Sequence, residues 1–258
     1  MPLPYKYVET YHHGLDRVGA EAVWRFFADR DCIHRVLPDG RTDIILRFQS
    51  DGTRPSSDLT PIVTGAATRF HMVPVLAGTG YVGVRLHPGT AHGVLAIDLE
   101  TIADRSLVGD AALAAIPALK ALCLPAQNID TLVDRLGDFV SSRLRGVTVD
   151  PLSATLIEML HVTGGRLPVA DIARLNGVDV RTVRRRVVSA TGLTPRQMAM
   201  VVQCHRALRL RFHDRGGVAS TAIEAGYADQ AHMSRVFRRM GGISPARLPD
   251  LVLAGFPI

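Results

Sequence analysis

Residues 219–245 read ASTAIEAGYADQAHMSRVFRRMGGISP, and residues 169–195 read VADIARLNGVDVRTVRRRVVSATGLTP. Each segment has the pattern of a short helix, a turn containing glycine, and a second helix that begins after an aspartate, followed by Gly-x-Ser/Thr-Pro. The small residues beside each turn, which let two helices approach closely, are Ala173, Gly177, Ala222 and Gly226. We therefore expect two helix-turn-helix units, at about residues 168–190 and 218–240.

The remainder of the last hundred residues also predicts helices, interrupted by glycine and proline. The expected helices cover residues 152–162, 168–175, 180–190, 195–213, 218–224, 229–240 and 245–251. The helix over residues 195–213, which joins the two units, would span about 28 Å at about 1.5 Å per residue. That length is comparable to the roughly 34 Å between successive major-groove faces of DNA, so one chain could present both units to one side of a duplex.

The second helix of each unit divides into an apolar face and a polar or basic face. The residues expected to face inward are Val183 and Val187 in the first unit, and Met233, Val236, Phe237 and Met240 in the second. The residues expected to face outward or to flank that face are Arg181, Arg184 and Arg185 in the first unit, and Gln230, Ala231, His232, Ser234 and Arg235 in the second. Arginine pairs with guanine, glutamine pairs with adenine, and an alanine can contact a thymine methyl group. The pattern is therefore typical of two helices that read bases.

Positive charge is concentrated in the same part of the chain. Residues 150–258 hold 15 Arg, no Lys and 8 acidic residues, whereas residues 1–149 hold 15 basic and 16 acidic residues. The resulting charges of +7 and −1 are typical of a phosphate-binding module joined to a second module, although a solvated basic surface would look the same. Arg186, Arg238 and Arg239 are candidates for phosphate contacts, with the alternative that Arg186 covers the apolar stripe beside it.

The stretch GYADQAHMSRVFRRMGGISPARL, residues 226–248, resembles the signature of the AraC/XylS family of bacterial transcriptional regulators. The resemblance implies base-reading roles for Arg181, Thr182, Arg184, Arg185, Gln230, Ala231, His232 and Arg235. It also implies a cytoplasmic, non-enzymatic regulator without a cofactor, with double-stranded DNA as its partner, and it raises RNA polymerase, a small-molecule effector and a homodimer as further expectations. The alternative function is a small-molecule-binding or catalytic N-terminal domain with accessory DNA binding, for example in a response to DNA alkyl damage.

The N-terminal half has the pattern of an α+β domain, with short antiparallel strands followed by helices, so the chain is predicted to be multi-domain with an all-α C-terminal part. The expected domains are residues 1–148, for sensing or dimerisation, and residues 149–258, for DNA binding. Apolar runs on both sides of Pro38-Asp39-Gly40 predict a hairpin. The helical stripe in residues 128–145 is expected to pack within its own domain rather than on a second copy. Stretches at residues 35–48 and 82–106 resemble an uncharacterised domain that occurs fused to AraC-type readers.

Four polar residues of the strand region are candidates for an effector site: Arg41, Asp43, Arg85 and His87. Two more specific hypotheses, a nucleophilic cysteine and a metal site, are less favoured. Cys204-His205-Arg206 resembles the nucleophile sequence of DNA alkyltransferases, but Gln203 replaces the usual proline. The scattered histidines lack metal-ligand spacing, so no metal site and no catalytic residue is expected. Neither a signal peptide nor a membrane span is predicted.

Overall fold

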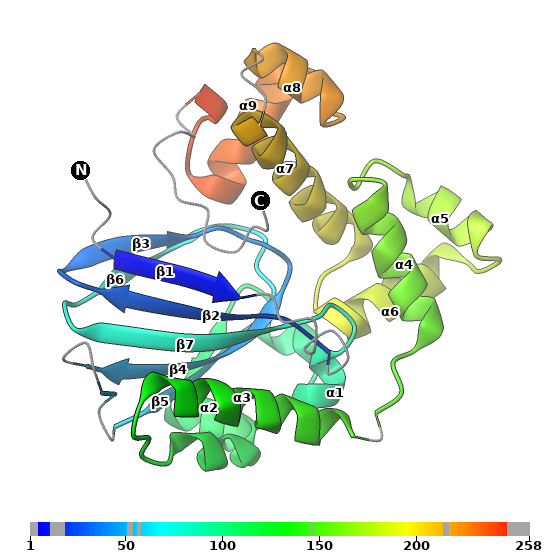
Figure 1. Ribbon diagram of the computed structural model, residues 1–258. Helices are drawn as coiled ribbons and strands as arrows, with labels where there is room; N and C mark the ends of the chain where they lie inside the picture. Colours follow the sequence, from blue (N-terminus) through cyan, green and yellow to red (C-terminus); the bar gives the residue numbers. More distant parts are fainter. Residues whose placement is uncertain are drawn as a thin grey trace.

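The computed structural model describes residues 5–10, 19–50, 54–55, 58–145, 147–213 and 217–246. Its strands are β1 (Tyr5–Thr10), β2 (Ala20–Ala28), β3 (Cys32–Val36), β4 (Thr42–Gln49), β5 (Thr60–Thr64), β6 (His71–Val75), β7 (Thr79–Leu86) and β8 (Ser106–Val108). Six of them form an antiparallel sheet in the order β1-β2-β7-β4-β5-β8, and β3 pairs with β6 in a separate two-stranded sheet. Figure 1 shows the strands together at one end of the molecule, with the C-terminal helices beside them.

The hairpin predicted around Pro38-Asp39-Gly40 is wrong. The two strands on either side of this turn, β3 and β4, belong to different sheets. β4 lies inside the large sheet between β5 and β7, so both of its edges are already paired, and β3 pairs with the distant β6. The turn, in which Gly40 has a φ of +72°, therefore carries the chain from one sheet to the other.

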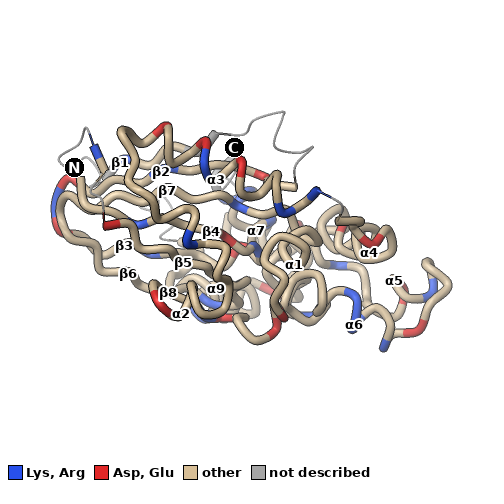
Figure 2. The backbone as a smooth tube through the Cα atoms, turned by 90° about the horizontal axis from the view of Figure 1, so that it is seen from below, with Lys and Arg blue, Asp and Glu red and all other residues tan. Residues whose placement is uncertain are grey.

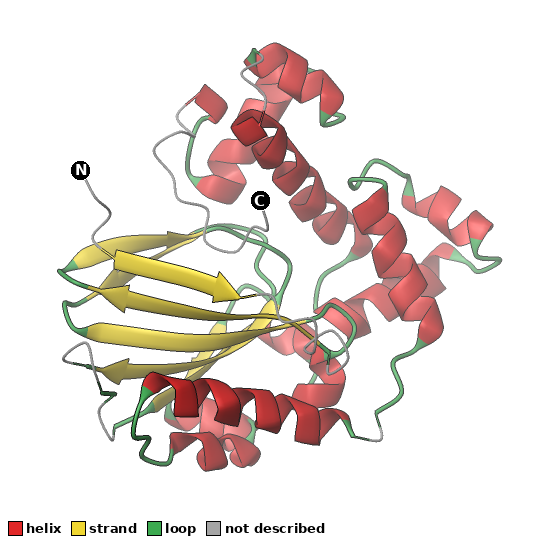
Figure 3. Ribbon diagram, in the orientation of Figure 1, coloured by secondary structure: helices red, strands yellow, loops and turns green. Residues whose placement is uncertain are grey.

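The large sheet has one face against helices and one face against the β3–β6 pair. The helical face is covered by α1 (Ala91–Leu95), η2 (Leu99–Ile102), α2 (Asp110–Ala115), η3 (Pro117–Cys123) and α3 (Ile129–Leu144), as Figure 3 shows. Alternate residues of the central strands, such as Ile44, Leu46 and Val84, are fully buried in this layer. Leu132, Leu136 and Val140 of α3 are buried in the same cluster. The prediction that this stripe packs within the chain is confirmed.

The C-terminal part is helical, as predicted. Its helices are α4 (Pro151–Val162), α5 (Val169–Leu175), α6 (Val180–Thr191), α7 (Pro195–His213), α8 (Val218–Glu224) and α9 (Gln230–Gly241). α5 and α6 form the first unit, α8 and α9 form the second, and α7 contacts α4, α6, α8 and α9. The helix predicted over residues 245–251 lies largely outside the described residues. No helix in the described part of the chain is long and apolar enough to cross a membrane.

Candidate DNA interface and ligand cavity

Both predicted reading helices, α6 and α9, begin and end in the same way. The carboxylate of Asp179 accepts a hydrogen bond from the backbone N–H of Thr182 at 2.7 Å, and that of Asp229 accepts one from the N–H of His232 at 2.6 Å. The hydrogen bond from the Thr182 backbone lowers the pKa of Asp179. Both helices stop at a glycine with positive φ, Gly192 or Gly242. The local sequence therefore fixes both ends of each helix.

The first helix, α6, has the two faces that the sequence predicts. Val183 and Val187 are fully buried, whereas Arg181, Arg184 and Arg185 are exposed. Figure 2 shows this basic segment at the end of the molecule that lies away from the strands. The half-buried Thr182 donates its hydroxyl hydrogen to Asp179 at 3.2 Å. Three guanidinium groups are thus available to a duplex, and Thr182 is engaged in the cap.

The second helix, α9, is held through Met233, Val236, Phe237 and Met240, all of which are buried. Gln230, Ala231 and Arg235 are exposed, and Ser234 is half-buried. His232 is also half-buried, because its ring packs edge-on against Tyr227 with 5.4 Å between centroids. The α9 residues predicted to read bases therefore include one arginine, Arg235, whereas those of α6 include three.

The three arginines predicted to contact phosphate differ in their surroundings. Arg238 is exposed. Arg239 is also exposed, and it donates to the sulfur of Met200 at 2.7 Å. Arg186 is half-buried and forms an ion pair with Asp150 at 3.3 Å, at the start of α4. The structure thus ties Arg186 to its own domain, so a phosphate would have to compete with Asp150 for this side chain.

Helix α7 joins the two units and also contacts the turn of the second unit. The Gln203 amide donates to the carbonyl oxygens of Ala225 and Gly226, at 3.2 and 2.9 Å, in the turn of the second unit. A Cβ atom at Gly226 would lie 2.6 Å from the side chain of Arg166, which precedes the first unit. The turn of the second unit therefore contacts α7 and the segment that precedes the first unit.

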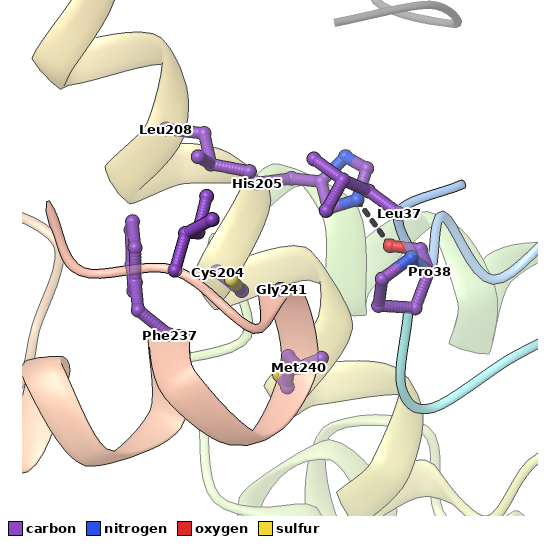
Figure 4. Close-up of a pocket in the computed structure, with 9 residues that line it drawn as sticks. Leu37, Pro38, Cys204, His205, Leu208, Phe237, Met240 and Gly241 are labelled. Carbon is purple, nitrogen blue, oxygen red and sulfur yellow. Dashed lines mark hydrogen bonds between the residues drawn. The ribbon is translucent and has the colours of Figure 1, made fainter. Parts of the chain in front are cut away.

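Hydrogen bonds join the N-terminal part to α7 and to the C-terminal end of α9. His205 of α7 donates from Nε2 to the carbonyl oxygen of Pro38 at 2.5 Å, as Figure 4 shows. The Arg35 guanidinium donates to the carbonyl oxygen of Gly241 at 2.8 Å. The Phe70 N–H donates to the carbonyl oxygen of Met240 at 2.6 Å. The β3–β6 region therefore holds the C-terminal end of α9.

Cys204 lies in the core between α7 and α9, beside a small cavity of about 10 Å³ (Figure 4). Burial raises the pKa of its thiol to about 12. A nucleophilic cysteine requires the thiolate. The surroundings of Cys204 therefore give no support to the alkyltransferase hypothesis at this position.

Lowering the pH is expected to destabilise the fold through His205. Burial lowers the pKa of this histidine to about 3, compared with about 6.5 in an unfolded chain. The unfolded state therefore takes up a proton that the folded state does not, and the free energy of unfolding falls by up to about 1.4 kcal/mol per pH unit as the pH drops from about 6.5 toward 3. Urea titrations between pH 4 and 7 should show a shallower pH dependence for His205→Asn than for the wild type. An equal decrease in slope for His92→Asn, which removes an exposed histidine, would contradict this account.

A cavity of about 460 Å³ separates the large sheet from the β3–β6 pair. Three of the four predicted effector residues, Arg41, Asp43 and Arg85, line it. His87 does not, because it lies beyond the end of β7 and is exposed, with Nδ1 2.8 Å from the carbonyl oxygen of Pro88. The assignment of His87 to this site is therefore corrected.

The predicted effector residues belong to a connected network of charges. The Arg85 guanidinium lies 3.2 Å from a carboxylate oxygen of Asp39 and 3.5 Å from one of Asp43. Arg41 forms two hydrogen bonds of 2.9 Å with Glu21. Burial opposes the charge of Asp39, but the nearby Arg85 and Arg41 outweigh it and lower the pKa of this carboxyl. The sequence did not predict Asp39 as a residue of this cavity, because it falls in the turn that was expected to form a hairpin. The closely spaced charges of Asp39, Arg41 and Asp43 are a signal that could have identified it.

Comparison with known proteins assigns both parts of the chain to described domain types. Residues 172–249 match a helix-turn-helix domain, and residues 21–108 match a domain of unknown function (DUF6597). The HTH-type transcriptional activator RhaS of Escherichia fergusonii is 34% identical over 77 residues, which are 30% of this chain and 28% of RhaS. RhaS of Escherichia coli strain SE11 is 31% identical over 74 residues, 29% of this chain and 27% of that protein. The matched part therefore spans less than a third of these curated relatives.

Two similar solved structures come from other bacteria. The C-terminal domain of AraT, a response regulator from Geobacillus stearothermophilus, is 15% identical with a TM-score of 0.39, and the match covers 43% of this chain and 95% of that one. ToxT from Vibrio cholerae O395 is 12% identical with a TM-score of 0.45, and the match covers 94% of this chain and 96% of ToxT.

Proposed function

Because its C-terminal region is a helix-turn-helix domain of the AraC/XylS type, we propose that this protein is a transcription regulator that binds specific sequences of duplex DNA. The observation that carries the proposal is the pair of capped helices, α6 and α9, each with a buried apolar face and an exposed polar face, mounted on one helix. In this proposal α6 and α9 enter successive major grooves. The exposed arginines of α6 read guanine. Gln230 and Arg235 of α9 also read bases, with one positive charge in place of three.

We further propose that the chain divides near residue 148 and that the N-terminal domain senses a small molecule in the 460 Å³ cavity. The division is supported by two hydrophobic clusters, one built from buried residues before 141 and the other mainly from residues after 155. The segment from Leu37 to Arg41 lines the cavity, and its Pro38 carbonyl accepts the hydrogen bond from His205. A ligand that moves this segment would change how the N-terminal domain holds α7 and α9.

In the same proposal the protein acts in the cytoplasm as a homodimer, with RNA polymerase as a partner and no catalytic role of its own. A dimer would place two C-terminal domains, each with two reading helices, on one operator. Light scattering of the full chain, with and without operator DNA, measures this directly. A single chain per duplex at saturating protein concentration would exclude the dimer while leaving DNA binding intact.

DNA binding itself is tested by titrating the full chain into a random-sequence duplex at low salt. The C-terminal region carries a net charge of +7, so we expect measurable non-specific affinity that falls steeply as salt rises, since bound arginines release counterions from the phosphates. The triple variant Arg181→Ala, Arg184→Ala, Arg185→Ala should reduce both the affinity and the salt slope. Absence of binding at low salt would count decisively against the proposed function.

The contact between the N-terminal domain and α9 gives a further expected result. Arg35→Ala removes the hydrogen bond to the Gly241 carbonyl and the guanidinium that lies 5.1 Å from the centre of the Phe70 ring. Loss of about 1.4 kcal/mol of local stability should speed hydrogen exchange at the Phe70 amide, which bonds to Met240, about tenfold. Arg25→Ala is the control. It removes an arginine that pairs with Asp130 on the helix-covered face of the large sheet. Equal exchange in wild type and Arg35→Ala would show that this contact does not hold α9.

A further inference from the structure

Both reading helices end against the N-terminal domain, and they do so at the same position of the repeated unit. Helix α6 stops at Gly192, where a Cβ atom would lie only 2.5 Å from the carbonyl oxygen of Leu99 in η2. Helix α9 stops at Gly242, where a Cβ atom would overlap the ring of Phe70. Both glycines have positive φ, so each one ends its helix and also lets the N-terminal domain approach closely.

Two segments of the N-terminal domain carry these contacts, and we call them together the interdomain bridge. They are residues 65–70, between β5 and β6, and residues 99–105, which begin with η2. The Gly65 N–H donates to the Arg105 carbonyl oxygen at 2.9 Å, and a Cβ atom at Gly65 would overlap the carbonyl group of Ile102. The two segments are therefore in backbone contact, and together they reach from the end of α6 to the end of α9.

Asp104 joins the two segments of the interdomain bridge. Its backbone N–H donates to the carbonyl oxygen of Ala66 at 3.0 Å. Its carboxylate accepts hydrogen bonds from the backbone N–H of Thr68 at 2.6 Å and from the Thr68 hydroxyl at 2.7 Å. The backbone of Asp104 has a φ of +56°, which aspartate adopts more readily than most other residues with a side chain. Asp104 is exposed, so its side chain contributes these hydrogen bonds rather than core packing.

The interdomain bridge lies between the ends of the reading helices and the large cavity. Ala66 is 1% exposed and belongs to the hydrophobic cluster of the C-terminal helices, and Ala103 packs against the same cluster. The Phe70 N–H donates to the backbone near the end of α9 at 2.6 Å. On the other side, Gly65 and Ala67 line the cavity. The bridge is therefore in contact with both parts of the chain.

Helix α7 is one connection between α6 and α9, and the interdomain bridge is a second one that runs through the N-terminal domain. Two bodies held at two separate places have less freedom to rotate relative to each other than two bodies held at one. We propose that the bridge sets the distance and angle between α6 and α9, with Asp104 as a positioning residue, so that the full chain prefers one spacing between the two blocks of bases that it reads. The inference rests on the proposed function only in taking α6 and α9 as the helices that read DNA.

The distance between the two helices can be measured without DNA. Ser189→Cys on α6 and Arg238→Cys on α9 place spin labels at two exposed positions. The other thiols that a label could reach are removed as Cys32→Ser and Cys123→Ser, whereas Cys204 is buried and stays. Pulsed electron paramagnetic resonance on this full chain should give one narrow distribution of distances.

Asp104→Gly in the labelled chain removes both side-chain hydrogen bonds to Thr68 and tolerates the positive φ. It should broaden or shift the distribution by about 1–2 Å, the size of typical helix shifts at interfaces. Asp104→Asn, the matched control, keeps an oxygen that can accept from the Thr68 N–H and should leave the distribution unchanged. Phe70→Ala removes the ring beside Gly242 and should act like Asp104→Gly. An unchanged distribution in Asp104→Gly would overturn the role of Asp104, and an unchanged distribution in both variants would overturn the bridge itself.

Operator spacing is the second readout, because a merely structural role for Asp104 would not change it. The probes are the duplex that the wild-type chain enriches most from a random pool, and the same duplex with one base pair inserted between the two blocks. The insertion should weaken binding of the wild type and of Asp104→Asn about tenfold, within the range for one mismatched base pair, and that of Asp104→Gly less than about threefold. Affinity for a random-sequence duplex should be the same for all three proteins, since their reading faces are intact. Equal losses in all three would contradict the proposal.

The two readouts separate this inference from the proposed function. A wild-type chain that binds no DNA would contradict the proposed function, while the spin-label distances would still support or exclude the bridge. A wild type that selects two blocks, together with unchanged distances and an unchanged spacing preference in Asp104→Gly, would contradict this inference alone.

Discussion

Phe237→Ala is expected to cost about 3–5 kcal/mol of stability, the typical effect of truncating a buried phenylalanine. The side chain is 1% exposed and packs between α9 and α7. Because a domain of this kind is stable by only about 5–15 kcal/mol, the variant should bind DNA weakly even at room temperature. Urea unfolding followed by circular dichroism measures the loss.

The control for Phe237→Ala is Ile223→Ala, which truncates an apolar side chain on α8 that is 72% exposed. Its effect should stay within about 0.5 kcal/mol. Comparable stability of the two variants would mean that α9 does not depend on its apolar face for its position.

Arg184→Ala is expected to lower the preference for the operator over random DNA by about 1–3 kcal/mol, or roughly 5- to 150-fold. The residue is exposed on the polar face of α6, where its guanidinium can reach base edges. Arg235→Ala should have a similar effect through α9. Competition binding at one fixed salt concentration gives the preference for each variant.

Arg239→Ala is the matched control for the two reading variants, because it removes the same charge from an exposed position outside the predicted reading face. It should weaken binding to operator and to random DNA about equally, since a phosphate contact carries no sequence information. Retention of wild-type discrimination by Arg184→Ala, Arg235→Ala and Arg239→Ala alike would show that the reading faces are assigned wrongly.

The sequence predicted the C-terminal part in detail because its signals are local. Aspartate caps, glycine stops and the spacing of Val183 and Val187 act within one or two helical turns, and α7 and α8 have the predicted bounds. Arg186 is an exception to these local signals, because its ion pair joins it to Asp150, which lies 36 positions earlier in the chain.

The N-terminal part was harder to predict because its pairing is non-local. Strand β2 was not expected, so Trp24, which lines the cavity, was not predicted. The turn at Pro38-Asp39-Gly40 looks like a hairpin from local sequence alone, and only the pairing of β3 with β6, about 40 residues away, shows otherwise. Arg41, Asp43 and Arg85 were found because charged residues within apolar strands are conspicuous, whereas His87 was included only because it follows the same strand.

The account depends most directly on two helices of one chain reading the same duplex. Selection of bound sequences from a random DNA pool by the full chain tests this in one measurement. We expect two enriched blocks with centres about 10–10.5 base pairs apart, and guanine should dominate the block read by α6 because its outer face carries three arginines. Enrichment of no sequence, or of one uninterrupted block too short for two helices, would contradict the central claim.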